Sequence, residues 1–576
     1  MRQVKQFRPD WSEQPPGKGT FRAIFKYGDP NTFKHPSEKW YAMLKEEFGM
    51  TDGDFRHKHG EGREPVVLDR PTGLSAGQID ALSDIVGREN TTTDVYQRAR
   101  YAYGKTVEEM MELGQGVIQE IADLVVHPRH KDDVGRIVRY CHEEKIPVYV
   151  FSGGSSVNLG LRPARGGVTL VLSTHMNKLL ALNEANQTAR VQPGMFGPDY
   201  EAALNQAPER FRARIRFTGG HFPQSFEFST VGGWVVTLGS GQASTYYGDA
   251  ADLVVSQEYV TPAGSFKTLD YPAAATGPKV NDIMKGAEGT FGVLVEVTMK
   301  IFRYWPENRH YFSFMFPSWK AAVMASRDIA QGEFGRPSVY RISDPEETDR
   351  GLKLYGIPSV VDWFLVRRGY KPMQRCLCLG TVEGDRDYAR LVKRKIRKIG
   401  KRHGAIYLGA YASKKWEKTR FTEPYMREDL HDFGITIDTL EASVTWDNLQ
   451  TLYQGVRAYI KRRPRTICMT HASHFYPQGA NLYFIFIGRF ENVDDYRAFQ
   501  AGILDHIQKH GGSLSHHHGI GRMIAPWIAH HLGKEQMAVL KALKKHFDPH
   551  NIMNPGGQLG LDLLGLELDP TQTRKM

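Results

Sequence analysis

The sequence predicts an α+β protein with more than one domain, and three observations lead to this prediction. The chain has 576 residues, too many for one compact domain. From Asp123 onwards, short β-prone apolar runs alternate with helical patterns, and the alternation continues beyond Trp305 after a change in composition. Stretches rich in glycine and hydroxyl side chains lie beside strands of the first half. We therefore expect a ligand-binding α+β domain followed by a second domain of strands and helices.

The composition is that of a globular protein with an excess of positive charge. Hydrophobic residues make up 41% of the chain and charged residues 24%, and the net charge is +11 with a pI near 9.2. This excess favours polyanions, anionic membrane surfaces or phosphorylated substrates. The four cysteines form neither a C-x-x-C pair nor a disulfide framework, so we expect a reducing compartment. The N-terminus does not read as a secretory signal, and no run approaches the ~20 apolar residues of a membrane span.

The first part of the chain, residues 1–116, is expected to form a helical and irregular lead-in. Residues 1–65 are polar and rich in Gly, Pro, Lys and His. Two capping boxes, Ser75–Gln78 and Thr106–Glu109, each precede apolar residues at helical spacing. These signals predict two helices before a first strand at Leu124–Val126.

A loop rich in glycine and serine follows the predicted strand Val148–Phe151, and the first domain is organised around it. The loop consists of Ser152, Gly153, Gly154, Ser155 and Ser156. Glycines allow close approach of a ligand to the backbone, and successive N–H groups in a tight turn form a cradle for anions. The loop matches neither of the two common nucleotide-binding fingerprints. Taken alone, it fits a pyrophosphate-binding loop and an ordinary turn about equally well.

Two further glycine-rich stretches follow, at residues 222–249 and 285–294. Each combines small residues and hydroxyls beside an apolar strand. One such stretch is weak support for a ligand site. Three within about 150 residues indicate one long ligand that passes several loops.

Beyond Trp305 the pattern of strand followed by helix predicts a mixed sheet with helices on one face. The predicted strands are His310–Phe316, Arg375–Val382, Thr436–Val444 and Leu482–Ile487. A helix over Leu391–Arg402 is strongly basic, with apolar residues on one side. Such a helix fits a solvated face, an anionic bilayer or a nucleic acid, and no nucleic-acid-binding motif accompanies it.

Three adjacent histidines, His516, His517 and His518, stand between glycines near the C-terminus. Imidazoles titrate near neutral pH, so this cluster suits proton transfer and contact with anions. A solvated polar turn is the alternative interpretation. We expect no metal, because no Cys or carboxylate lies at ligand spacing nearby in the sequence.

The three glycine-rich stretches, in this order and spacing, resemble the FAD-binding domain of the vanillyl-alcohol-oxidase type of flavoenzyme over residues 117–305. The resemblance implies that they surround the pyrophosphate, the isoalloxazine and the adenosine half of FAD. Many of those enzymes link the flavin through a histidine of the first loop, but Ser152–Ser156 contains none, so we expect non-covalent FAD. Besides Ser152–Ser156, the implied FAD-binding residues are Ser225, Ser229, Thr230, Gly232, Gly233, Thr237, Ser240, Glu288, Gly289, Thr290, Gly292 and Val293.

The S-H-H-H-G-I-G stretch and residues 225–234 are together similar to one branch of that family, the alkyldihydroxyacetonephosphate synthases of ether-lipid synthesis. This resemblance covers most of residues 117–555. It implies that Tyr483, with the three histidines, is catalytic, and that Arg427 and Arg341 bind substrate. The implied units are an N-terminal segment 1–116, an FAD-binding domain 117–305, a cap domain 306–510 and a C-terminal segment 511–576 that completes the active site.

Two features depart from that branch. Leu238 stands where the synthases carry an arginine and offers no charge, so we expect different contacts near that end of the flavin. The peroxisomal targeting peptide of the eukaryotic enzymes is missing, so we expect a cytoplasmic enzyme, peripheral at the inner membrane surface.

The reaction implied is a redox-neutral exchange, through an adduct at the flavin N5, of the acyl chain of acyl-dihydroxyacetone phosphate for a fatty alcohol. The implied partners are this phosphorylated lipid, the alcohol, an anionic membrane surface and a second copy of the chain in a homodimer, with no nucleic acid. An FAD-dependent 2-hydroxyacid dehydrogenase or oxidase, of the D-lactate or glycolate type, is the main alternative. A non-catalytic basic protein that binds nucleic acid or membrane is a third.

Overall fold

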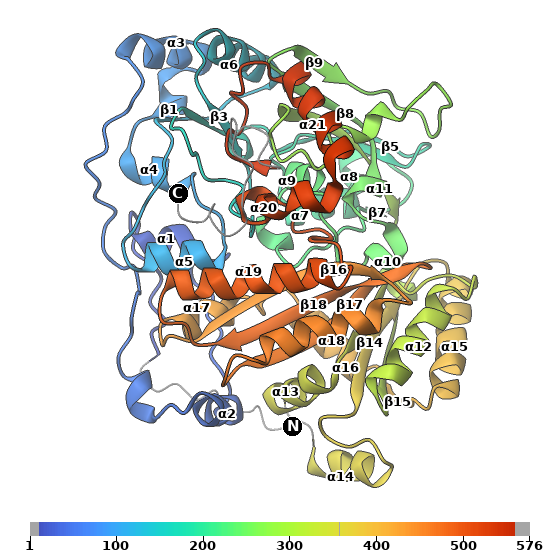
Figure 1. Cartoon of the computed structure of the whole chain (residues 1–576). Coiled ribbons are helices and arrows are strands. Elements are labelled where there is room, and N and C mark those ends of the chain that lie inside the picture. Colours follow the sequence, from blue (N-terminus) through green and yellow to red (C-terminus); the bar gives the residue numbers. More distant parts are fainter. Residues whose placement is uncertain (1–10, 356–357, 559–576) are drawn as a thin grey trace.

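The computed structural model describes residues 11–355 and 358–558 and shows two sheet-based domains stacked on each other (Figure 1). The α+β class predicted from the sequence is confirmed. Residues 1–10 of the expected N-terminal segment and 559–576 of the expected C-terminal segment lie outside the described residues. Within the described ranges, no helix combines the length and the apolar character needed to cross a bilayer.

The upper domain contains a four-stranded sheet in the order β1-β2-β4-β3. Its strands are β1 (Thr91–Thr92), β2 (Leu124–Val126), β4 (Val168–Val171) and β3 (Val148–Phe151). Strands β2, β3 and β4 are parallel and almost wholly buried, as their short apolar runs predict. The sheet also takes β1 from the N-terminal segment, and helix α3 (Ala76–Val86) packs against it, so this domain begins before residue 117.

A second sheet of the upper domain has the order β5-β6-β10-β8-β9 and is antiparallel. Its strands are β5 (Leu179–Asn183), β6 (Thr188–Val191), β10 (Val293–Lys300), β8 (Val254–Thr261) and β9 (Gly264–Lys267). The short helix α9 (Val231–Thr237) packs against it, so the second glycine-rich stretch lies beside this sheet.

The lower domain is built on one seven-stranded sheet in the order β15-β12-β14-β13-β17-β18-β16. Its strands are β12 (His310–Phe316), β13 (Val339–Ser343), β14 (Cys376–Val382), β15 (Ile406–Gly409), β16 (Thr436–Thr445), β17 (Ile467–Phe475) and β18 (Gly479–Gly488). Every neighbouring pair is antiparallel, so the expected mixed sheet is wrong. The tight turn at residues 476–478, for example, forces β17 and β18 into a hairpin.

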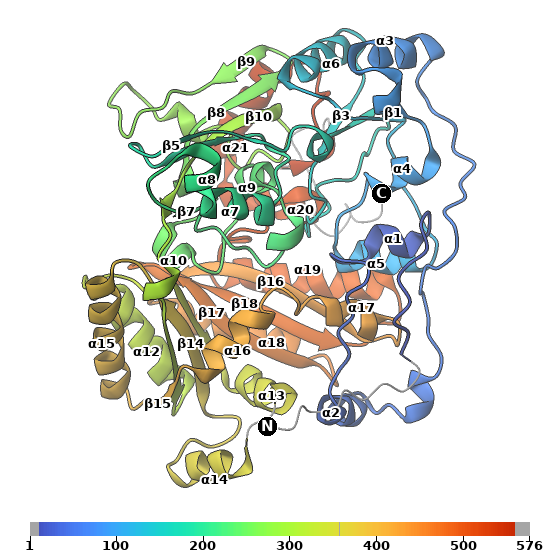
Figure 2. The same cartoon turned by 180° about the vertical axis from the view of Figure 1, so that it is seen from behind.

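Helices cover both faces of this sheet, where the sequence predicted one face. One face packs its apolar side chains against α12 (Trp319–Ala330), α15 (Arg386–Arg402), α18 (Leu449–Ile460) and α19 (Val493–Lys509). The other carries α13 (Pro345–Tyr355), α16 (Tyr411–Thr419) and α17 (Tyr425–His431), which are seen in the view from behind (Figure 2). Polar side chains such as Glu441 and Tyr483 lie on this second face, because strand residues alternate between faces.

The basic helix predicted over Leu391–Arg402 lies within α15. Its apolar residues Val392, Ile396 and Ile399 are buried in the core of the lower domain. The apolar side is therefore not available to a bilayer, and only the basic side faces solvent.

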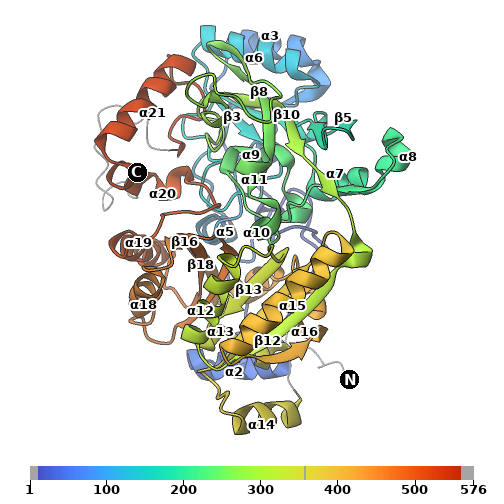
Figure 3. The same ribbon diagram turned by 90° about the vertical axis from the view of Figure 1, so that its right-hand side faces the viewer.

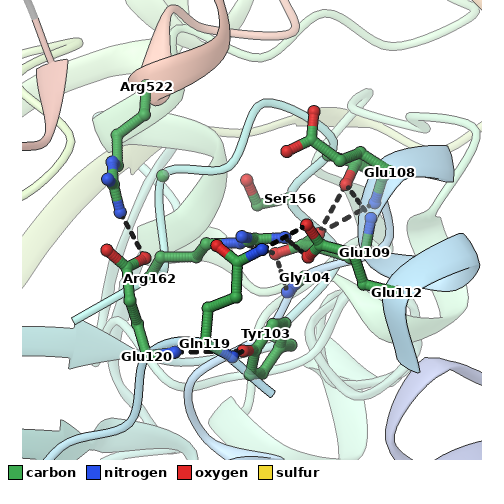
Figure 4. A network of polar contacts seen from close by, with 12 residues as sticks. Tyr103, Gly104, Glu108, Glu109, Glu112, Gln119, Glu120, Ser156, Arg162 and Arg522 are labelled. Atoms are coloured by element: carbon green, nitrogen blue, oxygen red, sulfur yellow. Dashed lines mark hydrogen bonds and ion pairs between the residues drawn. The ribbon is translucent and has the colours of Figure 1, made fainter. Parts of the chain in front are cut away.

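Helix α5 (Val107–Gly114) lies between the two domains (Figure 1), and Figure 4 shows its polar contacts with Arg162 of the upper domain. Its buried Glu112 forms ion pairs with Arg162, which follows the Gly/Ser loop, at 2.5 Å and with Arg497 of α19 at 2.6 Å. Burial alone would lower the pKa of Arg162, but Glu109 and Glu112 raise it. The chain after the Gly/Ser loop and the helical face of the lower domain thus share one buried charge network.

Candidate active site

The three adjacent histidines lie in a loop between α19 of the lower domain and α20 (Gly521–Leu532), whose apolar residues share a core with α19 (Figure 1). We call residues 513–521 the histidine loop. Two carboxylates hold it, one from each domain, and both accept hydrogen bonds from its backbone.

Glu441 of β16 holds the first half of the histidine loop. Its side chain is 1% exposed, and its Oε1 accepts hydrogen bonds from the backbone N–H groups of His516 at 2.9 Å, His517 at 3.0 Å and His518 at 3.2 Å. Ser515 Oγ donates to the same oxygen at 3.1 Å. Burial opposes ionisation, but the nearby histidines and these N–H donors lower the pKa of Glu441. The carboxylate is therefore ionised and fixes the backbone of all three histidines.

Glu288, which follows β8 and β9 in the upper domain, holds the second half. Its carboxylate accepts from the N–H groups of Ile520 at 2.6 Å and Gly521 at 2.9 Å, and Asn158 Nδ2 lies 3.3 Å away. Burial raises the pKa of Glu288 to about 7, and these donors oppose the rise. In the structure the Glu288 carboxylate thus supports the histidine loop, and its expected contact with FAD stays a prediction.

Asn158 connects the Gly/Ser loop to the histidine loop. Its Nδ2 donates to the carbonyl oxygen of His518 at 3.0 Å, and its Oδ1 accepts from Ser156 Oγ at 2.6 Å. Its carbonyl oxygen accepts from the N–H of Met523 at 3.1 Å. The predicted anion-binding loop and the predicted catalytic loop are therefore mechanically joined.

Tyr483 and His517 form the central pair of the site. Tyr483 Oη lies 2.7 Å from His517 Nε2. The β-sheet register places Tyr483 opposite both Glu441 and His471, and the His471 ring stacks on the Tyr483 ring at 4.5 Å. Burial raises the pKa of Tyr483 and lowers that of His517. The ground state is therefore a neutral tyrosine hydrogen-bonded to a neutral imidazole.

Polar contacts continue from this pair towards the upper domain. His517 Nδ1 lies 2.9 Å from His516 Nδ1, and His516 Nε2 lies 2.6 Å from Tyr476 Oη. Tyr476 Oη donates to Asp249 Oδ2 at 2.6 Å. A line of hydrogen bonds thus runs from the lower sheet across the domain boundary.

Two more histidines lie close to the cluster. His474 stacks on His516 at 5.2 Å, and His221 lies against Trp234 at 4.7 Å. In the part of the chain that is described, neither ring nitrogen of either residue has a hydrogen-bond partner. Burial lowers the pKa of His474 to about 3 and that of His221 to about 4. Both are neutral imidazoles with polar atoms free to meet a bound ligand.

Arg341 approaches the site from β13. It forms an ion pair with Glu347, whose Oε1 lies 3.1 Å from His471 Nδ1. Burial opposes ionisation of Glu347, but Arg341 and His471 lower its pKa to about 2. Arg341 thereby supports the ring that stacks on Tyr483, and its Nε has no partner among the described residues.

Arg427 of α17 lies at a separate basic corner. Its Nη1 donates to the carbonyl oxygen of Lys105 at 2.7 Å, whereas its buried Nε and Nη2 have no partner within the described ranges. Burial lowers the pKa of Lys105 to about 8, and the N–H of Lys105 donates to the carbonyl oxygen of Ser156 at 2.7 Å. Two guanidinium nitrogens are thus available to an anion beside the end of the Gly/Ser loop.

The predicted FAD loop has the features of an anion cradle. Among the described residues, no acceptor is assigned to the N–H groups of Gly153, Gly154, Ser155 or Ser156. Gly154 is buried and has φ +69°, and a Cβ there would meet the Phe151 ring at 2.3 Å. Unpaired N–H groups in a tight glycine turn are what a pyrophosphate requires. The residues present therefore fit the phosphates of FAD.

The second and third glycine-rich stretches border the same region. Thr230 Oγ1 donates to Ser152 Oγ at 2.8 Å, and a Cβ on Gly153 would come within 2.5 Å of the Phe228 carbonyl oxygen. A Cβ on Gly289, which has φ +80°, would meet only Val150 at 3.9 Å and Asn554 at 4.0 Å. Leu238 ends α9 with φ +54° and packs on Gly286. The three stretches converge, and the assignment of individual FAD contacts stays a prediction.

The residues of this site that sequence reasoning missed are Glu441, His471, His474, Tyr476 and Asp249. The stretch T-H-A-S-H-F-Y, residues 470–476, carried the only visible signal, two histidines and a tyrosine close together. Asp249 ends the second glycine-rich stretch, but nothing in the sequence connects it with the histidines.

Glu441, His517 and His518 bring three potential metal-ligand atoms within 4.8 Å of one another. Glu441 Oε1 already accepts several N–H and O–H donors, and His517 is engaged on both ring nitrogens. This donor set is used internally, so we assign it to loop support and proton transfer.

Comparisons with known proteins agree with this geometry. Residues 122–270 match the family model described as FAD binding domain, and residues 305–557 match the C-terminal domain of FAD linked oxidases. An alkyldihydroxyacetonephosphate synthase of Dictyostelium discoideum is 31% identical over 86% of this chain and 85% of its own. A solved structure of an alkyldihydroxyacetonephosphate synthase is 27% identical, with a TM-score of 0.75 over 91% of this chain and 92% of that one. A glycolate oxidase subunit of Bacillus subtilis is more distant, 26% identical over 84% of this chain and 97% of its own.

We predict that FAD is released by acid denaturation, because Ser152–Ser156 contains no histidine to link it. Gly154→Ala is expected to lose FAD, since the new Cβ meets Phe151 and the left-handed backbone is strained. The absorbance ratio at 280 and 450 nm of the purified protein measures this. Gly135→Ala, where a Cβ meets nothing within 4 Å, is the control and is expected to retain the flavin. Flavin that precipitates with the polypeptide would contradict the non-covalent prediction.

We predict that Glu441→Gln loosens the histidine loop. Glutamine keeps one acceptor oxygen, but its amide nitrogen cannot accept the N–H of His516 that Glu441 Oε2 accepts at 3.0 Å, and the loss of charge weakens the remaining bonds. The free energy of unfolding is expected to fall by about 2–4 kcal/mol. Hydrogen exchange of the amides of residues 516–518 is expected to accelerate, while that of 520 and 521 changes less. Equal protection in both proteins would refute the anchoring role.

Proposed function

Because the chain belongs to the alkyldihydroxyacetonephosphate synthase family of FAD-dependent enzymes, we propose that it exchanges the acyl chain of acyl-dihydroxyacetone phosphate for a fatty alcohol. The observation that carries this proposal is the Tyr483–His517 hydrogen bond of 2.7 Å at the domain boundary. It pairs a proton donor with a proton acceptor, and the Nε of the nearby Arg341 has no partner among the described residues.

FAD, when bound, supplies an electrophile and an electron sink in this region. The polypeptide supplies proton transfer. Tyr483 Oη is hydrogen-bonded to His517 Nε2, so a proton taken from the substrate carbon by the tyrosine oxygen is matched by transfer of the phenolic proton to the imidazole. Glu441 holds the backbone of His517 during this transfer.

Arg427 is proposed to hold the substrate phosphate. Its Nε and Nη2 form one edge of the guanidinium, and both are buried without a protein acceptor in the described chain. That edge suits two oxygens of a phosphate. Lys105 adds positive charge close by.

Arg341 is proposed to support the Tyr483–His517 pair at the end where the substrate binds. Its charge is already balanced by Glu347, which makes it a weaker phosphate ligand than Arg427. Its unpaired Nε can still donate one hydrogen bond to the substrate.

We predict that the FAD-loaded enzyme forms alkyl-dihydroxyacetone phosphate and free fatty acid from acyl-dihydroxyacetone phosphate and a fatty alcohol, with no oxygen uptake and no dye reduction. Tyr483→Phe keeps the ring and removes the hydroxyl, so kcat is expected to fall 10²–10⁴-fold with FAD content unchanged. Product analysis by mass spectrometry and oxygen-electrode recordings measure this. Reduction of the flavin by D-lactate or glycolate, without ether product, would move the enzyme to the 2-hydroxyacid oxidoreductases.

The lipid substrate needs a route from a membrane, and helix α14 (Ser359–Arg367) is proposed as the contact with an anionic bilayer. The helix projects from the lower domain on the side away from the upper domain (Figure 3). Val360 is 74% exposed and Trp363 59% exposed, which is unusual for large apolar residues on one short helix. Arg367 lies over the Trp363 ring, so apolar and basic groups share this surface.

The expected homodimer and cytoplasmic location stay predictions.

We predict that the protein sediments with vesicles containing anionic lipid and less with neutral vesicles. The double variant Val360→Asp/Trp363→Asp is expected to lose most of this binding, because apolar insertion is replaced by repulsion. Val539→Asp, which changes a residue 60% exposed on α21 (Lys534–Phe547), is the matched control and is expected to bind normally. If changing Lys393, Arg394, Arg397 and Lys401 of α15 to Glu has the larger effect, the basic helix is the contact instead.

A further inference from the structure

The line of hydrogen bonds that leaves Tyr483 ends on a carboxylate of the other domain. It passes through His517, His516 and Tyr476 to Asp249, with donor–acceptor distances of 2.7, 2.9, 2.6 and 2.6 Å. Asp249 directly precedes α11 (Ala250–Leu253) in the upper domain, whereas Tyr476 is in the turn between β17 and β18. The active-site tyrosine is thus connected to a charge outside the lower domain.

The chemistry of the carboxylate sets the direction of every bond in this line. An ionised Asp249 only accepts, so Tyr476 gives it its single proton. Tyr476 Oη must then accept from His516, which places the His516 proton on Nε2 and leaves Nδ1 as an acceptor. His517 therefore donates from Nδ1, and its Nε2 carries the lone pair that faces the Tyr483 hydroxyl.

The hydrogen-bond directions described above require an ionised Asp249. Burial would raise its pKa, but the hydrogen bonds that Ser240 and Tyr476 donate to it lower it. Ser240 Oγ donates to the second carboxylate oxygen at 2.5 Å, so both oxygens are held in place.

We propose that Asp249 is a positioning residue that fixes the tautomers of His516 and His517 and so aims a free lone pair of His517 Nε2 at Tyr483. This role rests on the proposed function, in which Tyr483 removes a proton from the substrate carbon beside the ketone. The substrate C–H bond breaks and an O–H bond forms at Tyr483, while the original phenolic proton moves to His517 Nε2. The electron pair left on carbon is delocalised onto the ketone oxygen. The imidazolium that results is stabilised by the negative charge of Asp249 at the end of the line.

Other titratable and charged groups also face this line, and all of them except Asp252 stay unchanged in the experiment below. They are His221, His471, His474, His518, Glu441, Asp252, Arg341 and Glu347. Asp252 has no hydrogen bond to Tyr476; its carboxylate accepts the N–H of Asp249 at 3.1 Å. Asp252→Asn is therefore a control with the same change of charge on the same helix.

The test compares wild type, Asp249→Asn, Tyr476→Phe, their double variant and Asp252→Asn, all loaded with FAD. Asparagine remains a good residue at a helix N-terminus, so Asp249→Asn is expected to fold. Without the carboxylate, the proton affinity of the imidazole pair falls. The acid limb of the pH profile of kcat is expected to move down by about one pH unit, and kcat to fall roughly 10- to 100-fold with little change in KM. Tyr476→Phe is expected to cause the same changes in the pH profile and in kcat. The double variant is expected to lose no more kcat than either single variant.

A measurement without substrate separates this proposal from the proposed function. Imidazole ¹⁵N NMR of histidine-labelled protein, assigned with His516→Gln and His517→Gln, is expected to show protons on His516 Nε2 and His517 Nδ1 in the wild type and in Asp252→Asn. Asp249→Asn is expected to lose this pattern. The opposite tautomers in the wild type, an unchanged pattern in Asp249→Asn, or equal kinetic effects of Asp249→Asn and Asp252→Asn would overturn the proposal. Correct tautomers in an enzyme inactive on acyl-dihydroxyacetone phosphate would instead refute the proposed function alone.

Discussion

The burial of two carboxylates under one loop is the interaction on which the rest of this site depends. A buried carboxylate is costly unless several donors satisfy it, and the backbone N–H groups of a loop are equally costly without acceptors. Glu441 and Glu288 meet both requirements at once, since each accepts N–H groups of the histidine loop. Because they come from different domains, the loop takes its conformation only when the domains are docked. The three histidines of the loop therefore owe their positions to the domain interface.

The same principle connects the cofactor loop to this interface. Glu112 of α5 pairs with Arg162 beyond the Gly/Ser loop and with Arg497 of the lower domain. Asn158, at the end of the Gly/Ser loop, bonds to the carbonyl oxygen of His518. Groups that would bind the phosphates of FAD and groups that would move the proton thus share their supports, so disorder in one loop is transmitted to the other.

Much of the fold could be predicted from the sequence, where local patterns were strong. The strands β3 (Val148–Phe151) and β12 (His310–Phe316) are where their apolar runs placed them. Strand β17 escaped notice because Thr470, His471 and Ser473 interrupt its apolar pattern. Those polar residues are tolerated because the strand lies in the middle of the sheet, with one face turned to the active site. Local propensity contains no information about such a neighbour.

By itself, the sequence determined the kind of chemistry: a flavin-type set of glycine loops, three adjacent imidazoles, a tyrosine and two arginines. These follow from residue types and short spacings, which do not change when the chain folds. Only the tertiary structure decided which of these side chains contact one another and which other residues they contact. The register of β16, β17 and β18 set Tyr483 beside Glu441 and His471, and domain docking brought Asp249 to Tyr476. Hydrogen-bond direction depends on which atoms meet, and residues far apart in the chain meet only in the folded protein.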